Sequence, residues 1–134
     1  MTIKYRRLTA LRSTIDAVVG NPAPEVPGLA VTVSTIGGRC EITVAGDLDI
    51  ATADGLADTG REIIASSDAA VVVVDLAGVE FAGSSGLGAL ISLHQVAEGV
   101  GKAFYLRNPT SRVARVIQLM GLDVVLPIEP TSHG

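Results

Sequence analysis

Apolar and polar residues alternate on both sides of a Gly37-Gly38 pair. Residues 29–35 read LAVTVST and residues 39–45 read RCEITVA. Such alternation is typical of a strand that turns one face to the core and the other to a more polar environment. Because two glycines separate the runs, the pattern predicts a tight β-hairpin with strands near 29–35 and 39–45.

The middle of the chain switches between helical spacing and a continuous apolar run. Residues 69–76, AAVVVVDL, are rich in β-branched side chains, which predicts a strand covered on both faces. The helix expected before this strand is capped by Thr52 and has an inner face of Leu56, Ile63 and Ile64. The helix expected after it follows the stretch FAGSSGLGAL, residues 81–90, and has inward positions Leu87, Leu90, Ile91 and His94.

The last third predicts three more elements. Residues 103–108 (AFYLRN) read as a short strand, and residues 111–120 (SRVARVIQLM) as a helix that begins after Pro109 and ends at Gly121. Residues 122–128 (LDVVLPI) read as a final edge strand. The order β-β-α-β-α-β-α-β predicts an α/β fold with a mixed, mostly parallel sheet, an initial hairpin and packed helices.

The N-terminal part has a different character. Leu8, Leu11, Ile15 and Val18 are spaced by three and four residues, which predicts one apolar helical stripe. The sequence GNPAPEVPG follows, and three prolines with two glycines in nine residues indicate a linker. The expected organisation is a helical extension (1–20), a linker (21–28), one compact domain (29–128) and a flexible tail (129–134), with the extension's role left open between dimerisation and covering a sheet edge.

Composition narrows the class of protein. The chain has 134 residues, a formal net charge of −4 and a pI near 5.0, which argues against nucleic-acid binding despite a small basic group at Arg6, Arg7 and Arg12. A single cysteine, Cys40, leaves no disulfide framework or thiolate metal site and is expected to be a core or edge residue. With no apolar leader or long apolar run, a soluble cytoplasmic protein is expected.

The serines and glycines of FAGSSGLGAL suggest a nucleotide site, which we tested against known motifs. Gly83 and Gly88 have the spacing of a phosphate-binding loop, but Ala89 and Leu90 occupy the positions of the required Lys and Ser/Thr. A dinucleotide fingerprint starting at Gly86 requires a third glycine where the chain has Ile91. Both nucleotide interpretations are therefore weak, and no cofactor or metal is expected.

A nucleophilic serine is the second hypothesis for this stretch. A Gly-x-Ser-x-Gly turn around Ser85 would need glycine where the chain has Leu87. The only histidines are His94, two turns further along the same predicted helix, and His133 near the C-terminus. Neither is placed to activate Ser85, so the chain is not expected to be an enzyme.

Two interpretations remain open from the residues alone. Ser84 or Ser85 is suited to cap the following helix, as most serines at such positions do. Alternatively, a serine in the first turn of a helix is a suitable phosphate acceptor, because backbone N–H groups and the helix dipole favour negative charge there.

Three stretches together resemble one known family. They are VAGDLDIATADGL (44–56), VVVVDLAGVEFAGSSGLGAL (71–90) and NPTSRVARVIQLMGLDVVLPI (108–128). In the same order, they are similar to the GELD-like turn, the Asp-Ser-Ser-Gly-Leu-Gly loop and the Pro-led last helix of the STAS domain (sulphate transporter and anti-sigma factor antagonist). The bare domain length is most similar to bacterial anti-sigma factor antagonists.

The resemblance implies a regulatory function for the glycine-serine stretch. In the family, the second serine of the loop is phosphorylated by an anti-sigma factor that is also a kinase, and phosphorylation breaks the complex. That position is Ser85 here, with Ser84 as the alternative acceptor. The implied protein binds its anti-sigma factor through a face that comprises Asp47, Asp49, Gly83, Ser84, Gly86, Leu87 and Gly88.

One residue departs from the family pattern. The family loop begins with aspartate, and this chain has Gly83 there. The departure bears on phosphorylation more than on the fold, and it favours an alternative function as an accessory or scaffold subunit of a transport ATPase or a sensory complex. Neither function involves direct contact with nucleic acid or membrane, and a homodimer is left open.

Overall fold

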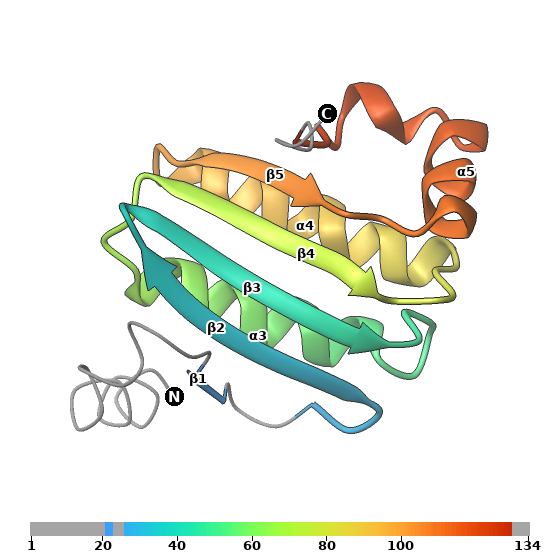
Figure 1. Ribbon diagram of the computed structural model, residues 1–134, viewed down its shortest axis with the longest axis horizontal. Helices are drawn as coiled ribbons and strands as arrows, with labels where there is room; N and C mark the ends of the chain where they lie inside the picture. The colour runs from blue at the N-terminus through green and yellow to red at the C-terminus, as the bar shows by residue number, and fades with distance from the viewer. Residues whose placement is uncertain (1–20, 23–25, 130–134) are drawn as a thin grey trace.

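A five-stranded mixed sheet carries two long helices on one face (Figure 1). The computed structural model describes residues 21–22 and 26–129. The strands lie in chain order across the sheet and are β1 (Asn21–Pro22), β2 (Leu29–Ile36), β3 (Arg39–Gly46), β4 (Val71–Gly78) and β5 (Ala103–Arg107). The helices are α3 (Ala53–Ser66), α4 (Ser84–Gly99), α5 (Ser111–Leu119) and the short 3₁₀ helix η1 (Leu122–Val124).

The predicted hairpin is confirmed. β2 and β3 pair antiparallel along their whole length, from Leu29 opposite Gly46 to Ile36 opposite Arg39. Gly37 and Gly38 both have positive φ, 55° and 78°, as a tight turn of this hand requires. The pairs β3–β4 and β4–β5 are parallel, so the sheet is mixed as predicted.

The core lies between the sheet and the helices. Leu56, Ile63 and Ile64 of α3 are buried, as the helical spacing predicted, and α4 contributes buried leucines of its own. β4 is covered on both faces, since Val72, Val73 and Val74 are all fully buried. This confirms the interpretation of the β-branched run.

A network of charged side chains covers the face of β4 opposite the helices. Arg107 of β5 donates to both carboxylate oxygens of Glu41 on β3, at 3.1 and 3.2 Å, and to Asp75 of β4 at 3.0 Å. The hydrogen bonds to Glu41, and secondarily to Asp75, raise the pKa of Arg107 above its ordinary value. Because β4 lies between β3 and β5, the Arg107–Glu41 pair crosses over it and helps to keep Val73 from water.

One predicted element is wrong. Residues 122–128 do not form an edge strand, because Gly121 adopts a left-handed conformation (φ 71°) and the chain turns into η1. Val124 is 84% exposed, whereas a strand packed on the sheet would bury alternate positions. What remains of the predicted pairing is a single parallel bridge between Leu106 and Ile128.

Residues on both sides of the predicted domain (29–128) make contacts with it. Within the segment expected to be a linker, Asn21 and Pro22 pair with β2, and Val26 is buried against Gly55 of α3. Glu129, placed in the expected tail, forms an ion pair with Arg39. The predicted helix at residues 3–19 and the rest of the tail lie outside the described residues.

Cys40 gives the fold a measurable dependence on pH. Its side chain is buried, as expected, and burial raises the pKa of the thiol above its usual value of 9.0, despite a hydrogen bond from Ser67 that acts in the opposite direction. The unfolded thiol therefore ionises first as pH rises. The stability contributed by the neutral thiol is fully present below the unfolded pKa and is lost as pH rises toward the folded pKa.

We expect the free energy of unfolding to fall more steeply between about pH 8 and about pH 10 in the wild-type protein than in Cys40→Ala. Urea unfolding at several pH values measures the two slopes. The variant also loses about 1 kcal/mol through the lost packing of the thiol, so the slopes and not the absolute values are compared. Identical slopes would contradict a buried thiol with a raised pKa.

Candidate regulatory site at the start of helix α4

The two loops that follow β3 and β4 are bonded to each other. Leu48 donates its backbone N–H to the Phe81 carbonyl at 2.8 Å and accepts from the backbone N–H of Gly83 at 2.9 Å. The Leu48 side chain is fully buried. Parallel strands end at the same edge of a sheet, so the Asp47–Asp49 turn and the glycine-serine stretch, far apart in sequence, become neighbours here.

The aspartate turn is held by its own polar groups. The Asp49 carboxylate accepts from the backbone N–H groups of Ala51 and Thr52, at 3.0 and 3.2 Å. The Thr52 hydroxyl donates to the Asp47 carbonyl at 2.8 Å and accepts from the N–H of Asp49 at 3.0 Å. Thr52 is the N-cap residue of α3, as predicted, but its side chain makes no capping hydrogen bond, because its hydroxyl closes this turn. Asp47 is exposed.

The first turn of α4 presents the two serines. Gly83 occupies the N-cap position with extended backbone (φ −91°, ψ −176°), and no side chain caps the helix. Ser84 is exposed and Ser85 is half-buried. Neither serine is the N-cap residue, so the interpretation of the serines as simple caps is wrong.

Gly86 and Leu87 fix the position of this turn. A Cβ on Gly86 would overlap the Leu48 backbone carbonyl, so the close approach of α4 to the aspartate loop requires glycine. Leu87 is fully buried in the core. Gly88 is exposed, and a Cβ there would meet open space. Gly86 and Leu87 therefore position the site, while Gly88 lies on its surface.

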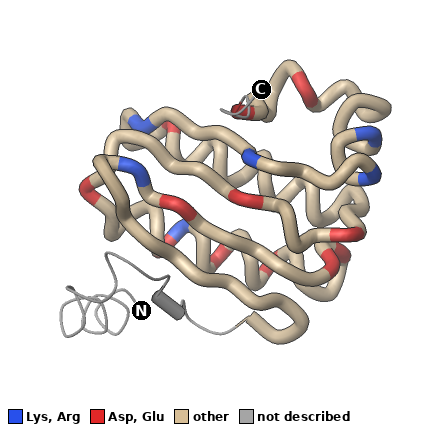
Figure 2. The backbone as a smooth tube through the Cα atoms, in the orientation of Figure 1, with Lys and Arg blue, Asp and Glu red and all other residues tan. Residues whose placement is uncertain are grey.

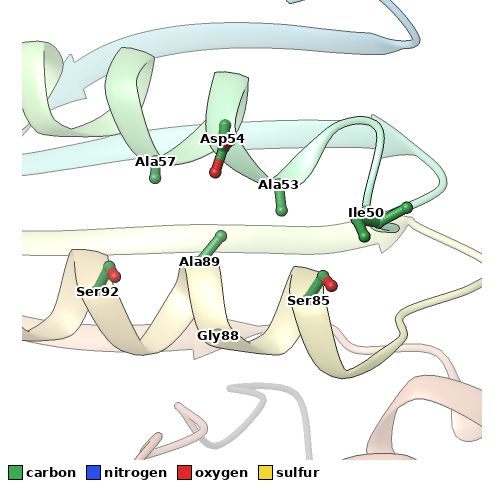
Figure 3. Close-up of a pocket in the computed structure, with 8 residues that line it drawn as sticks. All are labelled: Ile50, Ala53, Asp54, Ala57, Ser85, Gly88, Ala89 and Ser92. Carbon is green, nitrogen blue, oxygen red and sulfur yellow. The ribbon is translucent and has the colours of Figure 1, made fainter.

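Ser85 opens onto a cleft between α3 and α4 with a volume of about 320 Å³ (Figure 3). The residues that line it come from α3, from α4 and from the loop before α3: Ile50, Ala53, Asp54, Ala57, Ser85, Gly88, Ala89 and Ser92. Of these eight residues, the sequence had predicted Ser85 and Gly88 as site residues and missed the other six. The available signal was helical spacing, since positions 85, 88, 89 and 92 share one face of α4.

Acidic residues gather at the two loops (Figure 2). Asp47, Asp49 and Glu80 follow β3 and β4, and the one charged residue among those lining the cleft is Asp54. A cleft with an acidic and no basic lining residue does not favour a nucleotide, in agreement with the missing lysine at position 89. Over residues 21–22 and 26–129, no group of three or more His, Cys, Asp or Glu side chains could hold a metal ion.

His94 is occupied away from Ser85. Its ring packs edge-on against Phe104 at a centroid distance of 5.5 Å, and its Nδ1 lies 4.0 Å from the Glu98 carboxylate. His133 lies outside the described residues. The structure thus gives no support to a serine nucleophile activated by His94.

Comparison with known proteins identifies the family to which this fold belongs. The family model described as "Mlab, STAS domain" matches residues 31–127, and the chain therefore belongs to the STAS domain family. It is 33% identical over 106 residues to RsfB, the anti-sigma-F factor antagonist of Mycobacterium tuberculosis, covering 78% of this chain and 84% of RsfB.

Solved structures show the same fold. An anti-sigma factor antagonist from Mycobacterium paratuberculosis superimposes with a TM-score of 0.69 at 30% identity, covering 82% of this chain and 93% of that one. The unphosphorylated form of the anti-sigma factor antagonist SpoIIAA has a TM-score of 0.63 at 20% identity, covering 78% and 91% of the two chains. In the described part of the chain, no helix is long and apolar enough to cross a membrane.

Two glycines in α4 allow a matched test of the close approach to Leu48. We expect Gly86→Ala to destabilise the protein by about 1–3 kcal/mol, because the new methyl must displace the Leu48 backbone. Gly88 lies two residues further along α4 and is exposed. Gly88→Ala is therefore expected to stabilise the protein by about 0.5–1 kcal/mol through helix propensity. Urea unfolding of both variants measures the difference. Equal effects of the two substitutions would contradict the packing role of Gly86.

The backbone at Gly83 is compatible with the family's aspartate. Its φ is negative, and a Cβ would make ordinary contact with the Phe81 ring at 3.4 Å. An aspartate there could accept from the N–H groups of the first turn. We therefore expect Gly83→Asp to raise the free energy of unfolding by a few tenths of a kcal/mol and Gly83→Ala to lower it. Thermal and urea unfolding report both, and an aspartate variant no more stable than the alanine variant would show that position 83 does not act as an N-cap.

Proposed function

We propose that this protein is a non-enzymatic anti-sigma factor antagonist that is switched by phosphorylation of Ser85. The observation that carries the proposal is the position of Ser85 in the first turn of α4, where it lines a surface cleft. Backbone hydrogen bonds of Leu48 join the loop before this turn to the aspartate turn. The similarity to RsfB, itself named an anti-sigma-F factor antagonist, supports the antagonist role. The partner is then an anti-sigma factor with kinase activity.

The fold can accept a phosphate at this position. The N–H groups at the start of α4 have no side-chain cap, and the helix dipole favours negative charge there. A phosphate adds about two negative charges and three acceptor oxygens at a residue that lines an open cleft. The half-buried hydroxyl of Ser85 is therefore a site where modification changes the surface more than the core.

The same phosphate would change what the surface can bind. Asp54 already lines the cleft opposite Ser85 (Figure 3), and Asp47 and Asp49 lie in the adjoining loop. Two further negative charges would add like charge to this group and would have to be desolvated beneath any docked protein. A partner fitted to the unmodified cleft would be released.

The direct test is phosphorylation by a cognate kinase-type anti-sigma factor in the presence of ATP. We expect intact-mass spectrometry to show the addition of one phosphate to the wild-type protein and to Ser84→Ala, and none to Ser85→Ala. Phosphate on Ser85→Ala but not on Ser84→Ala would move the acceptor to Ser84. No phosphate on any variant, with binding intact, would reject the switch and leave the antagonist role.

Binding is tested separately from modification. We expect Ser85→Asp to lose at least about tenfold in affinity for the anti-sigma factor, equivalent to about 1.4 kcal/mol, whereas Ser85→Ala retains binding. Calorimetric titration with the purified anti-sigma factor measures both.

The accessory-subunit function is favoured by one observation, the glycine at position 83 in place of the family's aspartate. It predicts that a pull-down from the source cell recovers subunits of a transport ATPase or a sensory complex rather than a kinase-type anti-sigma factor. Recovery of such subunits, with equal amounts on Ser85→Asp, would replace the phosphorylation switch with a scaffold role.

A further inference from the structure

An exposed apolar patch begins at the end of α5. The run at residues 122–128, expected to be an edge strand, is turned away from the sheet by the left-handed Gly121, and of its apolar residues only Leu126 is fully buried. Five large apolar side chains from the end of α5 onward are exposed, and we call them the α5 patch: Leu119, Met120, Val124, Val125 and Ile128. Leu119 is 73% exposed and Val124 84%. Exposed apolar residues that gather in this way mark an interaction surface more often than isolated ones do.

Positive charge precedes the patch on the same helix. Arg112, Arg115 and Leu119 are spaced by three and four residues, so they share one face of α5. All three are exposed, whereas Val113 and Ile117 are buried on the opposite side of the helix. Among the residues that the structure describes, neither arginine has a hydrogen-bond or ion-pair partner. The exposed face of α5 is therefore basic at its start and apolar at its end.

Negative charge follows on the other side of Leu119. Asp123 lies in η1, which contacts α5, and its side chain is exposed. It has no ion-pair partner within the described ranges 21–22 and 26–129. Figure 2 shows basic residues on α5 and an acidic residue in the segment that follows it. From α5 to η1 the surface thus runs from unpaired arginines through apolar residues to an unpaired aspartate.

A surface with opposite charges on either side of an apolar centre is complementary to itself. A two-fold axis through the centre places the arginine end of one copy against the aspartate end of the other. The apolar residues of the two copies then cover each other and leave water together. A partner that carries only one sign of charge would satisfy one end of this surface and not the other.

We propose that the α5 patch is the interface of a symmetric homodimer, with Leu119 at its centre and Arg115 of each copy paired with Asp123 of the other. Arg115 is assigned to this pair because it lies one helical turn from Leu119, whereas Arg112 lies two turns away. The second copy supplies the apolar cover that residues 122–128 do not find on their own sheet.

The dimer leaves the candidate site open. None of the eight residues that line the cleft between α3 and α4 belongs to α5 or η1. A dimer would therefore present two copies of Ser85, and a partner with two binding sites would gain avidity from it. This consequence rests on the proposed function, whereas the dimer does not, so a protein that is never phosphorylated could still form it.

Sedimentation equilibrium of the full-length protein tests the dimer without any partner. We expect the weight-average mass to rise with concentration from 13.7 kDa toward twice that value. Leu119→Lys places a charge at the centre of the contact and is expected to raise the dissociation constant by at least about tenfold. Val100→Lys alters another exposed apolar residue, just after α4, and is the matched control that should leave the dissociation constant unchanged. Thermal unfolding checks that both variants are folded.

Charge reversal tests the two-fold symmetry. Arg115→Glu and Asp123→Lys each bring like charges together twice per dimer, so each alone is expected to raise the dissociation constant by about tenfold. An equimolar mixture of the two variants should form a heterodimer, because both of its charge pairs are then of opposite sign. Native mass spectrometry identifies the heterodimer by its mass. Added salt should reduce the effect of the charge reversals but not that of Leu119→Lys.

The outcomes separate the possible occupants of the patch. A wild-type protein that stays at 13.7 kDa up to about 1 mM would overturn the proposal and leave a different protein as the occupant. A dimer that Leu119→Lys does not weaken would also overturn it, because the interface would then lie elsewhere on the chain. A dimer weakened by both charge reversals but not restored in their mixture would reject the pairing of Arg115 with Asp123 across a two-fold axis.

Discussion

The position of the candidate site depends on one buried leucine. Leu48 buries its side chain in the core and bonds both of its backbone polar groups to the loop that leads into α4. Gly86 allows α4 to approach that backbone more closely than any side chain would permit. The aspartate turn and the first turn of α4 are therefore held against each other, and from this position Ser85 faces the cleft.

Helices cover one face of the sheet and paired charged side chains cover the other. The candidate site lies on the face that carries the helices. On one face, α3 and α4 bury the core and form the cleft between them. On the other, Arg107 joins Glu41 and Asp75 across β4 and shields Val73 without a helix. Because the paired charges satisfy one another, Val73 stays buried on that face without a covering helix.

The sequence predicted most helices and strands but not the cleft, because the cleft depends on packing between helices and not on local periodicity. Hairpin, helices and central strands follow from local periodicity, which one chain displays directly. The cleft depends on how α3 and α4 lie against each other, which is set by a contact between Gly60 and Leu93, where a Cβ would come within 2.7 Å. The false edge strand at 122–128 had the right apolar pattern, but the left-handed Gly121 decided against it.

The glycine at position 83 gives the site a charge arrangement of its own. An aspartate at the N-cap would accept from the first N–H groups of α4 and occupy the donors that a phosphate would use. Here those donors have no side-chain cap, and the nearest lining carboxylate, Asp54, lies across the cleft on another helix. A phosphate on Ser85 would thus be attracted by the helix it sits on and repelled by the helix it faces. In the proposed switch, the charge of the phosphate would therefore act on a partner docked at the cleft.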